Sequence, residues 1–229
     1  MKEFERLQKI ISEDDFKRLS NIKVLIIGIG GVGGYAFEAL VRSGVINITI
    51  VDADNVEISN LNRQIIATHE TIDMQKCIAA KNRAESINKD VKITTINKFI
   101  IEDNIDELFN TNYDYIIDAC DTISTKVHLI KKAHKKNIKI ISCMGAGNRF
   151  DPSKLSITEI SKTSYDPVAK VIRKLLKDAG IKKKTYVVAS TEKPVKTSDR
   201  IPGSIVTVPA VAGIYCASYV INDVLRKNS

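Results

Sequence analysis

Charged side chains that suit phosphate and metal chemistry follow apolar runs in this 229-residue chain. Asp52 and Asp54 follow one run and Asp121 follows another, while Arg63 and Lys76 lie in the polar stretch after the first. Two cations can neutralise a polyphosphate, and a carboxylate is the hard oxygen ligand that Mg²⁺ prefers. Such groups stabilise charge on a phosphoryl centre and on a departing pyrophosphate. The set therefore favours ATP chemistry over hydride transfer, which needs an apolar nicotinamide pocket.

Each of these residues also has a plain structural interpretation. Asp54 and Asp118 are of the type that caps helices or forms turns at strand ends. Lys76 taken alone is a helix-surface residue, and Arg63 with Asp121 taken alone is a structural ion pair. The joint occurrence of the set, in this order, favours the functional interpretation.

Four closely spaced glycines follow the apolar residues 24–27, and a helix-like pattern begins after them. They are Gly28, Gly30, Gly31 and Gly33. A strand, a tight turn and a helix in this order present backbone N–H groups and a helix dipole to phosphate. An acid at the end of the next strand, here Asp52, would bond ribose hydroxyls. The glycine spacing alone suits NAD, ATP or a turn without a ligand, so the choice of ATP depends on the charged set.

Strands that alternate with helices must position these residues. We expect strands at 24–27, 45–52, 91–96, 114–119 and 138–143, and helices at 12–19, 32–43, 75–88 and 122–137. Residues 55–70 are polar and predict a loop with short helical turns. This alternation calls for a parallel sheet with right-handed crossovers, in which ligands bind beyond the carboxyl ends of the strands.

The pattern changes after residue 147. Residues 155–160 alternate like a half-exposed antiparallel strand, 168–180 form a basic helix, 185–189 a strand, and 192–203 a mobile loop. Residues 205–221 predict a buried strand followed by a helix, with a membrane-associated tail as the alternative. The fold class is therefore α/β: a Rossmann-like, doubly wound, mostly parallel sheet extended by antiparallel strands, with short N-terminal helices. We expect one domain over 1–229, with N-terminal helices at 1–20, a nucleotide-binding core at 21–147 and a substrate and dimer region at 148–229.

Positive charge is concentrated in one segment. Residues 161–200 hold eleven Lys or Arg and four acids, which accounts for nearly all of the net charge of +8. Such a balance favours an acidic partner, with RNA the obvious candidate. A solvated lysine-rich surface is the alternative.

The cysteines and histidines predict no metal centre. The four cysteines form no C-x-x-C pair, so we expect no structural zinc and a reducing, cytoplasmic location. The charged N-terminus does not resemble a signal peptide. Three histidines form no cluster, and His128 and His134 are expected at the surface of one lysine-rich helix.

Five motifs together resemble the ubiquitin-activating-enzyme-like adenylyltransferases, the superfamily of ThiF, MoeB and HesA. They are the glycine turn, Asp52-Ala53-Asp54, Ser59-Asn60-Leu61-Asn62-Arg63-Gln64, Lys76 and Asp118-Ala119-Cys120-Asp121, and they span about 20–125. The resemblance implies that Asp52 holds the ATP ribose and that Asn60, Arg63 and Lys76 contact the phosphates. It implies that Asp121 binds Mg²⁺ and that Arg6 reaches into a partner subunit's site.

The second half is similar to a narrower branch, the tRNA threonylcarbamoyladenosine dehydratase family. The similar segments are 141–149, 151–152, 160–164, 166–171 and 201–204. The resemblance implies a cytosolic homodimer that uses ATP to cyclise N6-threonylcarbamoyladenosine in tRNA through an acyl adenylate. It leaves open a Na⁺ or K⁺ site near 145–147 and a cysteine-desulfurase or sulfur-acceptor partner.

The ring closure implied by this resemblance is intramolecular and needs no enzyme thiol, so Cys143 is assigned to packing. We expect tRNA backbone contacts from basic residues of the second half. They are Lys162, Lys170, Arg173, Lys174, Lys182, Lys183 and Lys184, while Arg149 is expected to contact the tRNA substrate at the substrate end of the ATP pocket. Two other functions stay open: activation of a ubiquitin-like or sulfur-carrier protein, which the missing zinc pairs disfavour, and an NAD-dependent oxidoreductase.

Overall fold

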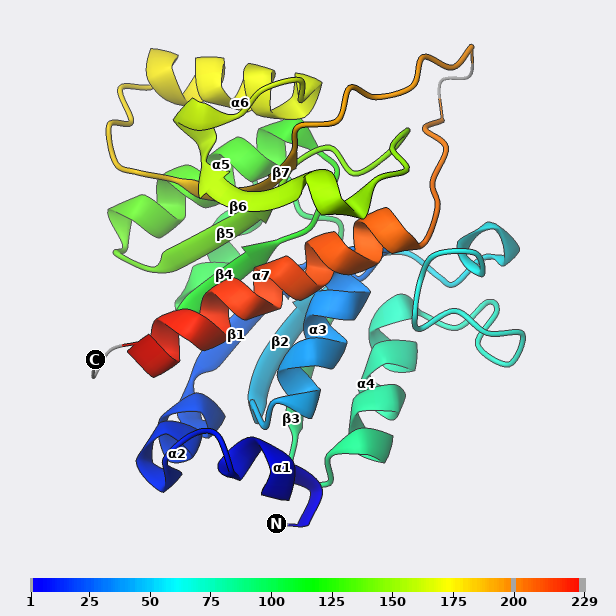
Figure 1. Ribbon diagram of the computed structural model, residues 1–229, viewed down its shortest axis with the longest axis vertical. Helices are drawn as coiled ribbons and strands as arrows, with labels where there is room; N and C mark the ends of the chain where they lie inside the picture. The colour runs from blue at the N-terminus through cyan, green and yellow to red at the C-terminus, as the bar shows by residue number, and fades with distance from the viewer. Residues whose placement is uncertain (1, 199–200, 227–229) are drawn as a thin grey trace.

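A seven-stranded sheet lies at the centre of the computed structural model, which describes residues 2–198 and 201–226 (Figure 1). The strands are β1 (Lys23–Ile27), β2 (Asn47–Val51), β3 (Lys92–Ile96), β4 (Tyr115–Asp118), β5 (Lys139–Cys143), β6 (Leu155–Glu159) and β7 (Tyr186–Ser190). Their order across the sheet is β3-β2-β1-β4-β5-β7-β6. The order reverses between β1 and β4, and a ligand crevice is expected at such a point.

Most of the sheet is parallel, as the sequence predicts. Every pair from β3 to β7 is parallel, and in the described part of the chain β6 alone is antiparallel, paired to β7. β7 lies between β5 and β6, so the half-exposed strand predicted from alternation is the sheet edge. The predicted α/β fold class is confirmed.

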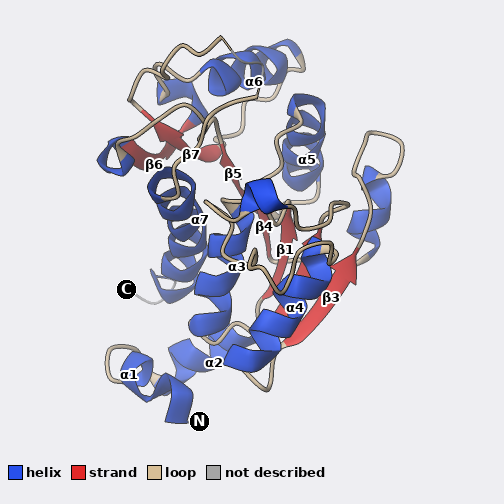
Figure 2. Ribbon diagram, turned by 90° about the vertical axis from the view of Figure 1, so that its right-hand side faces the viewer, coloured by secondary structure: helices blue, strands red, loops and turns tan. Residues whose placement is uncertain are grey.

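Helices cover both faces of the sheet and bury a separate core on each. Successive residues of β1 enter different cores: Val24 and Ile26 face one, Leu25 and Ile27 the other. The first core includes α3 (Gly33–Arg42), α4 (Lys76–Ile87) and α7 (Thr207–Leu225), and the second includes α5 (Ile123–Lys135) and α6 (Pro167–Asp178). Figure 2 shows α3 and α7 on one side of the strands and α5 on the other. Burial on both faces explains why the central strands read as unbroken apolar runs.

Short helices precede the sheet, as predicted. A 3₁₀ turn (Lys2–Phe4) leads into α1 (Glu5–Gln8), and α2 (Glu13–Asn21) begins where the Ser12 hydroxyl accepts the Asp15 N–H at 3.0 Å. The ring of Phe16 packs under Gly44, whose φ of +85° ends the α3 segment. These helices lie at the end of the molecule marked by the N-terminus (Figure 1).

The strand predicted at the start of 205–221 is wrong, because the chain forms one helix over Thr207–Leu225. Pro209 lies in its first turn, where a missing N–H is tolerated. A Cβ on Gly213 would lie 2.2 Å from the Val32 carbonyl oxygen, so small residues let α7 pack closely on α3. α7 is long and apolar enough to cross a membrane by composition, yet Val208, Ala212 and Cys216 are fully buried in the core.

Candidate nucleotide-binding site

A cavity of about 590 Å³ lies at the carboxyl ends of β1, β2 and β4 and brings the predicted nucleotide-site residues together. Among its lining residues are Gly28, Gly30, Gly31, Asp52, Asp54, Asn60, Arg63, Lys76 and Asp121. Residues of the second half complete it, namely Ala146, Gly147, Ile201, Pro202, Gly203 and Ser204. Strand ends in a parallel sheet meet at one edge, which is why distant motifs converge here.

Close backbone approach explains the glycines of the turn. Gly28 has a φ of +86°, and a Cβ on it would lie 2.7 Å from the Ala119 carbonyl oxygen. A Cβ on Gly33 would lie 1.8 Å from the Gly28 carbonyl oxygen. Gly33 is therefore a packing residue that lets α3 start against β1, whereas Gly30 and Gly31 line the cavity. The positive end of the α3 dipole lies at this turn and favours an anion there.

Asp52 is held in place by backbone donors. Its carboxylate accepts the Ile29 N–H at 2.7 Å and the Asp54 N–H at 2.9 Å. Ile29 belongs to the glycine turn, so the carboxylate also fixes the turn relative to β2. These two bonds fix the orientation of the Asp52 carboxylate at the cavity.

Lys76 is buried, so its interpretation as a helix-surface residue is wrong. Its side chain is 8% exposed at the start of α4, and its ammonium lies 2.7 Å from Asp54 and 4.0 Å from Asp52. The Asp54 side chain is 65% exposed and can turn away. A phosphate entering the cavity can therefore take over the Lys76 ammonium without leaving a buried charge unpaired.

The polar segment after β2 holds Asn60 and Arg63 by local bonds. Asn60 is 5% exposed, and its amide oxygen accepts the Glu57 N–H at 3.1 Å in a capping box. Arg63 donates to the Ser59 carbonyl at 2.6 Å and to the Asn62 amide oxygen at 3.0 Å. Within the described residues no ion pair joins Arg63 to Asp121, so the remaining guanidinium donors can serve phosphate.

Gln64 is a lining residue for which the sequence suggested no role. Its amide oxygen is buried and has no hydrogen-bond partner among the described residues. An orphaned acceptor in a cavity is costly unless a ligand donates to it. Lys98, Phe99 and Ile100 also line the cavity, and the strand-end rule applied to β3 would have found them.

Asp118 has a structural role behind the cavity. It is fully buried, and both its oxygens lie 3.2 Å from the Lys126 ammonium, which also donates to the Cys143 carbonyl at 2.8 Å. Burial alone would lower the pKa of Lys126, but the charge and hydrogen bond of Asp118, together with Cys120 and Cys143, raise that pKa on balance. Burial and the same carboxylate raise the pKa of Cys120, which stays a thiol. The network fixes the turn that carries Asp121.

Asp121 fits a Mg²⁺ ion that arrives with a nucleotide. Its carboxylate is exposed in the cavity and accepts one bond, from the Thr122 hydroxyl at 3.3 Å. The described residues contain no group of three or more His, Cys, Asp or Glu side chains able to hold a metal alone. Mg²⁺ is commonly held by one or two carboxylates together with phosphate oxygens and water, and the exposed carboxylate of Asp121 fits such a site.

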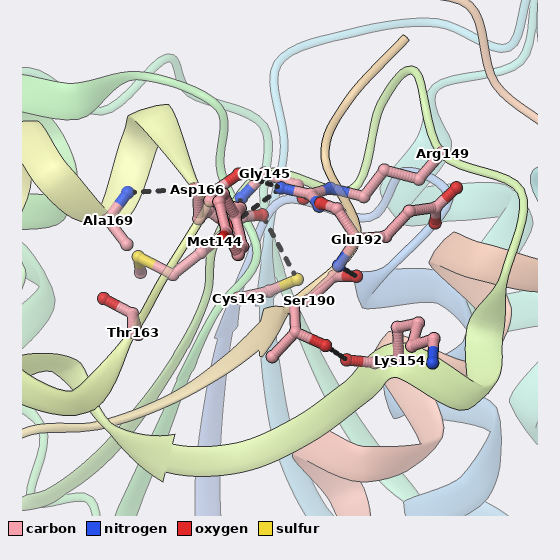
Figure 3. Close-up of polar contacts among 12 residues, drawn as sticks. Cys143, Met144, Gly145, Arg149, Lys154, Thr163, Asp166, Ala169, Ser190 and Glu192 are labelled. Atoms are coloured by element: carbon pink, nitrogen blue, oxygen red, sulfur yellow. Dashed lines mark hydrogen bonds and ion pairs between the residues drawn. The ribbon is translucent and has the colours of Figure 1, made fainter.

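Arg149 points inward, which corrects the expectation that it contacts tRNA. It is 2% exposed, and its guanidinium donates to the carbonyls of Gly145 and Glu192 beside Asp166 (Figure 3). A tRNA phosphate cannot reach a guanidinium enclosed in this way. Arg173 is half-buried and donates to the Ile160 and Thr163 carbonyls at 3.2 and 3.0 Å.

The predicted tRNA-contact lysines lie on the surface. Exposed positions are Lys162, Lys170, Lys174, Lys182, Lys183 and Lys184. A hollow of about 310 Å³ between α6 and the start of β7 is lined by Lys177, Lys182, Lys183, Lys184 and Arg173. Glu159, 3.3 Å from Lys184, is the acid in this lining.

Three other expectations meet the structure with different outcomes. Cys143 is 4% exposed in the core, which agrees with packing. His128 and His134 are half-buried rather than on the surface, and pair with Glu102 and Thr185. Arg6 is exposed on α1 and does not line the cavity of its own chain.

Comparison with known proteins identifies relatives over the full length of the chain. The model of the ThiF family matches residues 4–229. A tRNA threonylcarbamoyladenosine dehydratase of Bacillus subtilis is 38% identical over 241 residues, covering 98% of this chain and 95% of that protein. One from Haemophilus influenzae is 30% identical over 246 residues, covering 99% and 94%.

A solved structure agrees with these relatives. The crystal structure of the Escherichia coli tRNA N6-threonylcarbamoyladenosine dehydratase TcdA in complex with ATP superposes with a TM-score of 0.93 at 30% identity. It covers 99% of this chain and 95% of that one. A further structure of the same enzyme holds AMP.

Proposed function

This chain belongs to the ThiF family, and we propose that it is an ATP-dependent tRNA threonylcarbamoyladenosine dehydratase. One observation carries the proposal: the 38% identity to the Bacillus subtilis dehydratase extends over nearly the whole of both proteins. The E. coli relative of known structure binds ATP, and the cavity described above holds the cations and carboxylates that ATP needs.

The reaction begins with a carboxylate of the substrate. The threonyl carboxylate of N6-threonylcarbamoyladenosine attacks the α-phosphorus of ATP, and pyrophosphate leaves. The product is an acyl adenylate, in which the carboxyl carbon is a strong electrophile. The carbamoyl group of the same nucleoside attacks that carbon, loses its proton and closes a ring, and AMP leaves with the former carboxylate oxygen. The net change in the nucleoside is the loss of one water.

Different residues of the cavity bind different parts of ATP. Asp52 accepts the ribose hydroxyls, and the glycine turn with the start of α3 faces the phosphates. Asn60, Arg63 and Lys76 donate to phosphate oxygens and offset the charge that develops on the pyrophosphate. Asp121 would hold Mg²⁺, which would supply Lewis-acid stabilisation at the phosphoryl oxygens.

The second step requires position rather than an enzyme nucleophile. Nucleophile and electrophile belong to one nucleoside, so proximity supplies a large part of the rate. Cys120 is kept as a thiol and Cys143 is 4% exposed in the core, so neither is placed to form a thioester. This chemistry separates the proposal from sulfur-carrier activation.

We assign tRNA binding to the exposed lysines of the region 148–229. Phosphate contacts need accessible cations, and Lys162, Lys170, Lys174 and Lys182 to Lys184 are exposed. The hollow beside α6 concentrates five cations against one acid. Arg173 contributes with those donors that the Ile160 and Thr163 carbonyls leave free.

The proposal includes a cytoplasmic homodimer in which Arg6 completes the partner's site. Its support is the apolar outer side of α7, where Ile214 is 44% exposed and Tyr215 and Tyr219 are half-buried. A second copy is the occupant we assign to that side. A Na⁺ or K⁺ ion near 145–147 gains no support, because the Gly145 carbonyl already accepts from the Arg149 cation at 2.9 Å. A sulfur-acceptor partner remains a prediction from resemblance.

Nucleoside mass spectrometry tests the function. The protein is incubated with ATP, Mg²⁺ and tRNA that carries threonylcarbamoyladenosine. The tRNA is then digested, and the masses of its nucleosides are measured. We expect the modified nucleoside to lose one water, with one AMP formed per event. Matched tRNA without the modification is the control and should yield no AMP. AMP formation that requires a Gly-Gly-tailed protein instead of tRNA would replace this function with carrier activation.

A further inference from the structure

Two segments far apart in the sequence form one side of the nucleotide cavity, here called the C-terminal wall. Its lining residues are Ala146, Gly147, Ile201, Pro202, Gly203 and Ser204. The segments touch closely, since a Cβ on Gly147 would lie 2.7 Å from the Cβ of Pro202. The Asn62 amide donates to the Ser204 carbonyl at 3.0 Å, so the wall also adjoins the Arg63 segment. The wall is therefore one of the surfaces that a substrate in the cavity can meet.

Asn148 joins the two segments of the wall. Its N–H donates to the Gly203 carbonyl at 2.8 Å, and its side-chain oxygen accepts the Gly203 N–H at 2.6 Å. Its own carbonyl accepts the Val195 N–H at 2.7 Å. The residue has a φ of 57°, a left-handed conformation that asparagine tolerates better than most residues. One residue thus binds both ends of the segment from 195 to 203.

Arg149, the next residue, bonds to Gly145, which directly precedes the wall residue Ala146, and to segments behind the wall. Its Nε donates to the Gly145 carbonyl at 2.9 Å, and Nη1 donates to the Glu192 carbonyl. Nη2 lies 3.4 Å from the Tyr165 carbonyl oxygen and 3.5 Å from the Asp166 carboxylate. Figure 3 shows the guanidinium reaching across to Gly145 and Asp166. A planar fork can meet several acceptors at once, which the single ammonium of lysine cannot.

Two carboxylates complete the arrangement. Glu192 accepts the Phe150 and Asp151 N–H groups, each at 3.0 Å, so residues 149–151 and 192 hold each other. Asp166 accepts the Gly145 N–H at 3.1 Å and caps α6 through the Ala169 N–H at 3.0 Å. The wall is therefore joined through Asp166 to α6, the helix that carries Lys170 and Lys174.

We propose that Asn148 and Arg149 form a clamp that positions the C-terminal wall and thereby sets how the modified nucleoside of tRNA meets bound ATP. This inference rests on the proposed function and assigns two positioning residues to it. Neither residue contacts Asp52, Lys76 or the glycine turn, so ATP should bind normally when the clamp is loosened. The clamp also connects α6 to the wall, because Asp166 caps α6 and accepts the Gly145 N–H. A shift of α6 on tRNA binding would therefore be passed to the wall.

Arg149→Lys is the sharpest variant, because it keeps the charge beside Asp166 and removes the fork. We expect kcat/KM for tRNA to fall by about tenfold to a hundredfold, because misplacement near 1 Å is enough for such a loss. The Kd for ATP should stay within about twofold. Amide hydrogen exchange at Val195 and Gly203 should quicken at least about tenfold, since both N–H groups bond to Asn148.

Arg83→Met is the matched control, because Arg83 also forms a bidentate contact, to the buried Glu38 on α3, away from the wall. It should lower the melting temperature while leaving exchange at 195 and 203 and both kinetic constants near wild type. Asn148→Gly is a milder variant that keeps the left-handed backbone and loses only the side-chain acceptor. We expect it to quicken exchange at Gly203 about threefold, less than Arg149→Lys does.

The exchange measurement needs no substrate, so it separates the clamp from the proposed function. If the wild-type protein fails to dehydrate tRNA, the proposed function is wrong. The rates of amide exchange at Val195 and Gly203 would still show whether Asn148 and Arg149 hold the wall. Arg149→Lys with wild-type exchange and wild-type kcat/KM would overturn the clamp. An equal loss of ATP binding and tRNA turnover would also overturn it, because that result marks general unfolding rather than positioning.

Discussion

The two sides of the nucleotide cavity use charged residues in opposite ways. The side built from residues 28–121 holds Arg63 and Asp121 by a few bonds to near neighbours and leaves charge facing the cavity. The C-terminal wall turns its charges inward: the side chains of Arg149 and Asp166 are 1% and 0% exposed and are occupied by backbone groups and by each other. Residue type alone therefore does not separate a ligand-binding cation from a structural one.

The difference lies in what each charge has as a partner in the folded chain. A buried ion is tolerated where a partner and hydrogen bonds replace water, and that saturation leaves nothing for a ligand. A cation or carboxylate short of partners at a strand end is available to phosphate or metal. We therefore expect substitutions on the first side to change chemistry, and substitutions in the wall to change position and stability.

Asp121→Ala tests the first half of this comparison and should have the largest effect. We expect AMP formation to fall by about 10²- to 10³-fold, because the carboxylate that holds Mg²⁺ at the phosphoryl centre is lost. Stability should change by less than about 0.5 kcal/mol, because the side chain is exposed. Single-turnover AMP release and thermal melting measure the two quantities.

Asp103→Ala is the control for Asp121→Ala, since Asp103 is an exposed carboxylate that does not line the cavity. It should behave as wild type in both measurements. Near-normal AMP release in the Asp121 variant would contradict the assignment of Asp121 to Mg²⁺. The contrast between the two sides of the cavity would then lose its support from this residue.

Lys126→Met tests whether partner saturation, rather than location, decides the outcome. Lys126 lies behind the first side of the cavity, yet it is saturated by Asp118 and the Cys143 carbonyl. Its removal leaves a buried carboxylate unpaired, so we expect a loss of about 3 kcal/mol of unfolding free energy or more. Urea denaturation measures it. Lys135→Met, at an exposed position on α5, is the control and should cost little.

The double variant Lys126→Met with Asp118→Asn sharpens this test. Neutralising Asp118 removes the unpaired charge, so part of the lost stability should return. A double variant less stable than Lys126→Met alone would mean that Asp118 contributes something other than partnership with the lysine.

The first side of the cavity could be predicted from sequence, and the wall could not. Gly28, Asp52, Lys76 and Asp121 each follow or open a recognisable element, and the parallel order of strands forces those ends to one edge. Their individual roles in binding remain predictions. Arg149 meets Glu192, 43 residues away, only because the chain returns past β5, and no local pattern encodes that return.

The strand predicted at the start of α7 is wrong for a related reason. A continuous apolar run reads equally as a buried strand or a buried helix. The helix is favoured by its packing on α3. Gly213 has no side chain to block that approach, and the small side chains of Ala212 and Cys216 are fully buried. That information belongs to the helix pair and not to either segment alone.

Reversing the charge of Lys182, Lys183 and Lys184 together to Glu should weaken tRNA binding by at least about tenfold and reduce its salt dependence. These exposed lysines line the hollow beside α6, apart from both sides of the nucleotide cavity, and they have charge available for a ligand. ATP affinity should stay unchanged. Filter binding at several salt concentrations measures the tRNA affinity.

A matched reversal of Lys17, Lys89 and Lys92 controls for net charge, since these exposed lysines lie outside the basic segment. It should weaken tRNA binding much less. Equal losses in the two triple variants would reduce the effect to the net charge of the protein and remove the hollow beside α6 from the binding surface.

The smallest effect concerns His134 on α5, a half-buried titratable side chain that contacts Thr185. Its Nε2 lies 2.8 Å from the Thr185 hydroxyl, and burial, followed by the nearby Lys183 charge, lowers its pKa from the ordinary value of 6.5. The folded protein thus favours the neutral ring, whereas the unfolded chain binds a proton near pH 6.5. The stability that this preference provides is present above pH 6.5 and is lost as the pH falls from 6.5 through the folded pKa.

His134→Gln should therefore flatten the decline of unfolding free energy between pH 7.5 and pH 5.5, by less than the loss in Lys126→Met. Urea denaturation at the two pH values measures the difference. Because Lys183 contributes to the lowered pKa, the triple Lys→Glu variant should also show a shallower slope. A steeper decline of unfolding free energy in His134→Gln would contradict this prediction. It would mean that the folded protein favours the charged ring of His134.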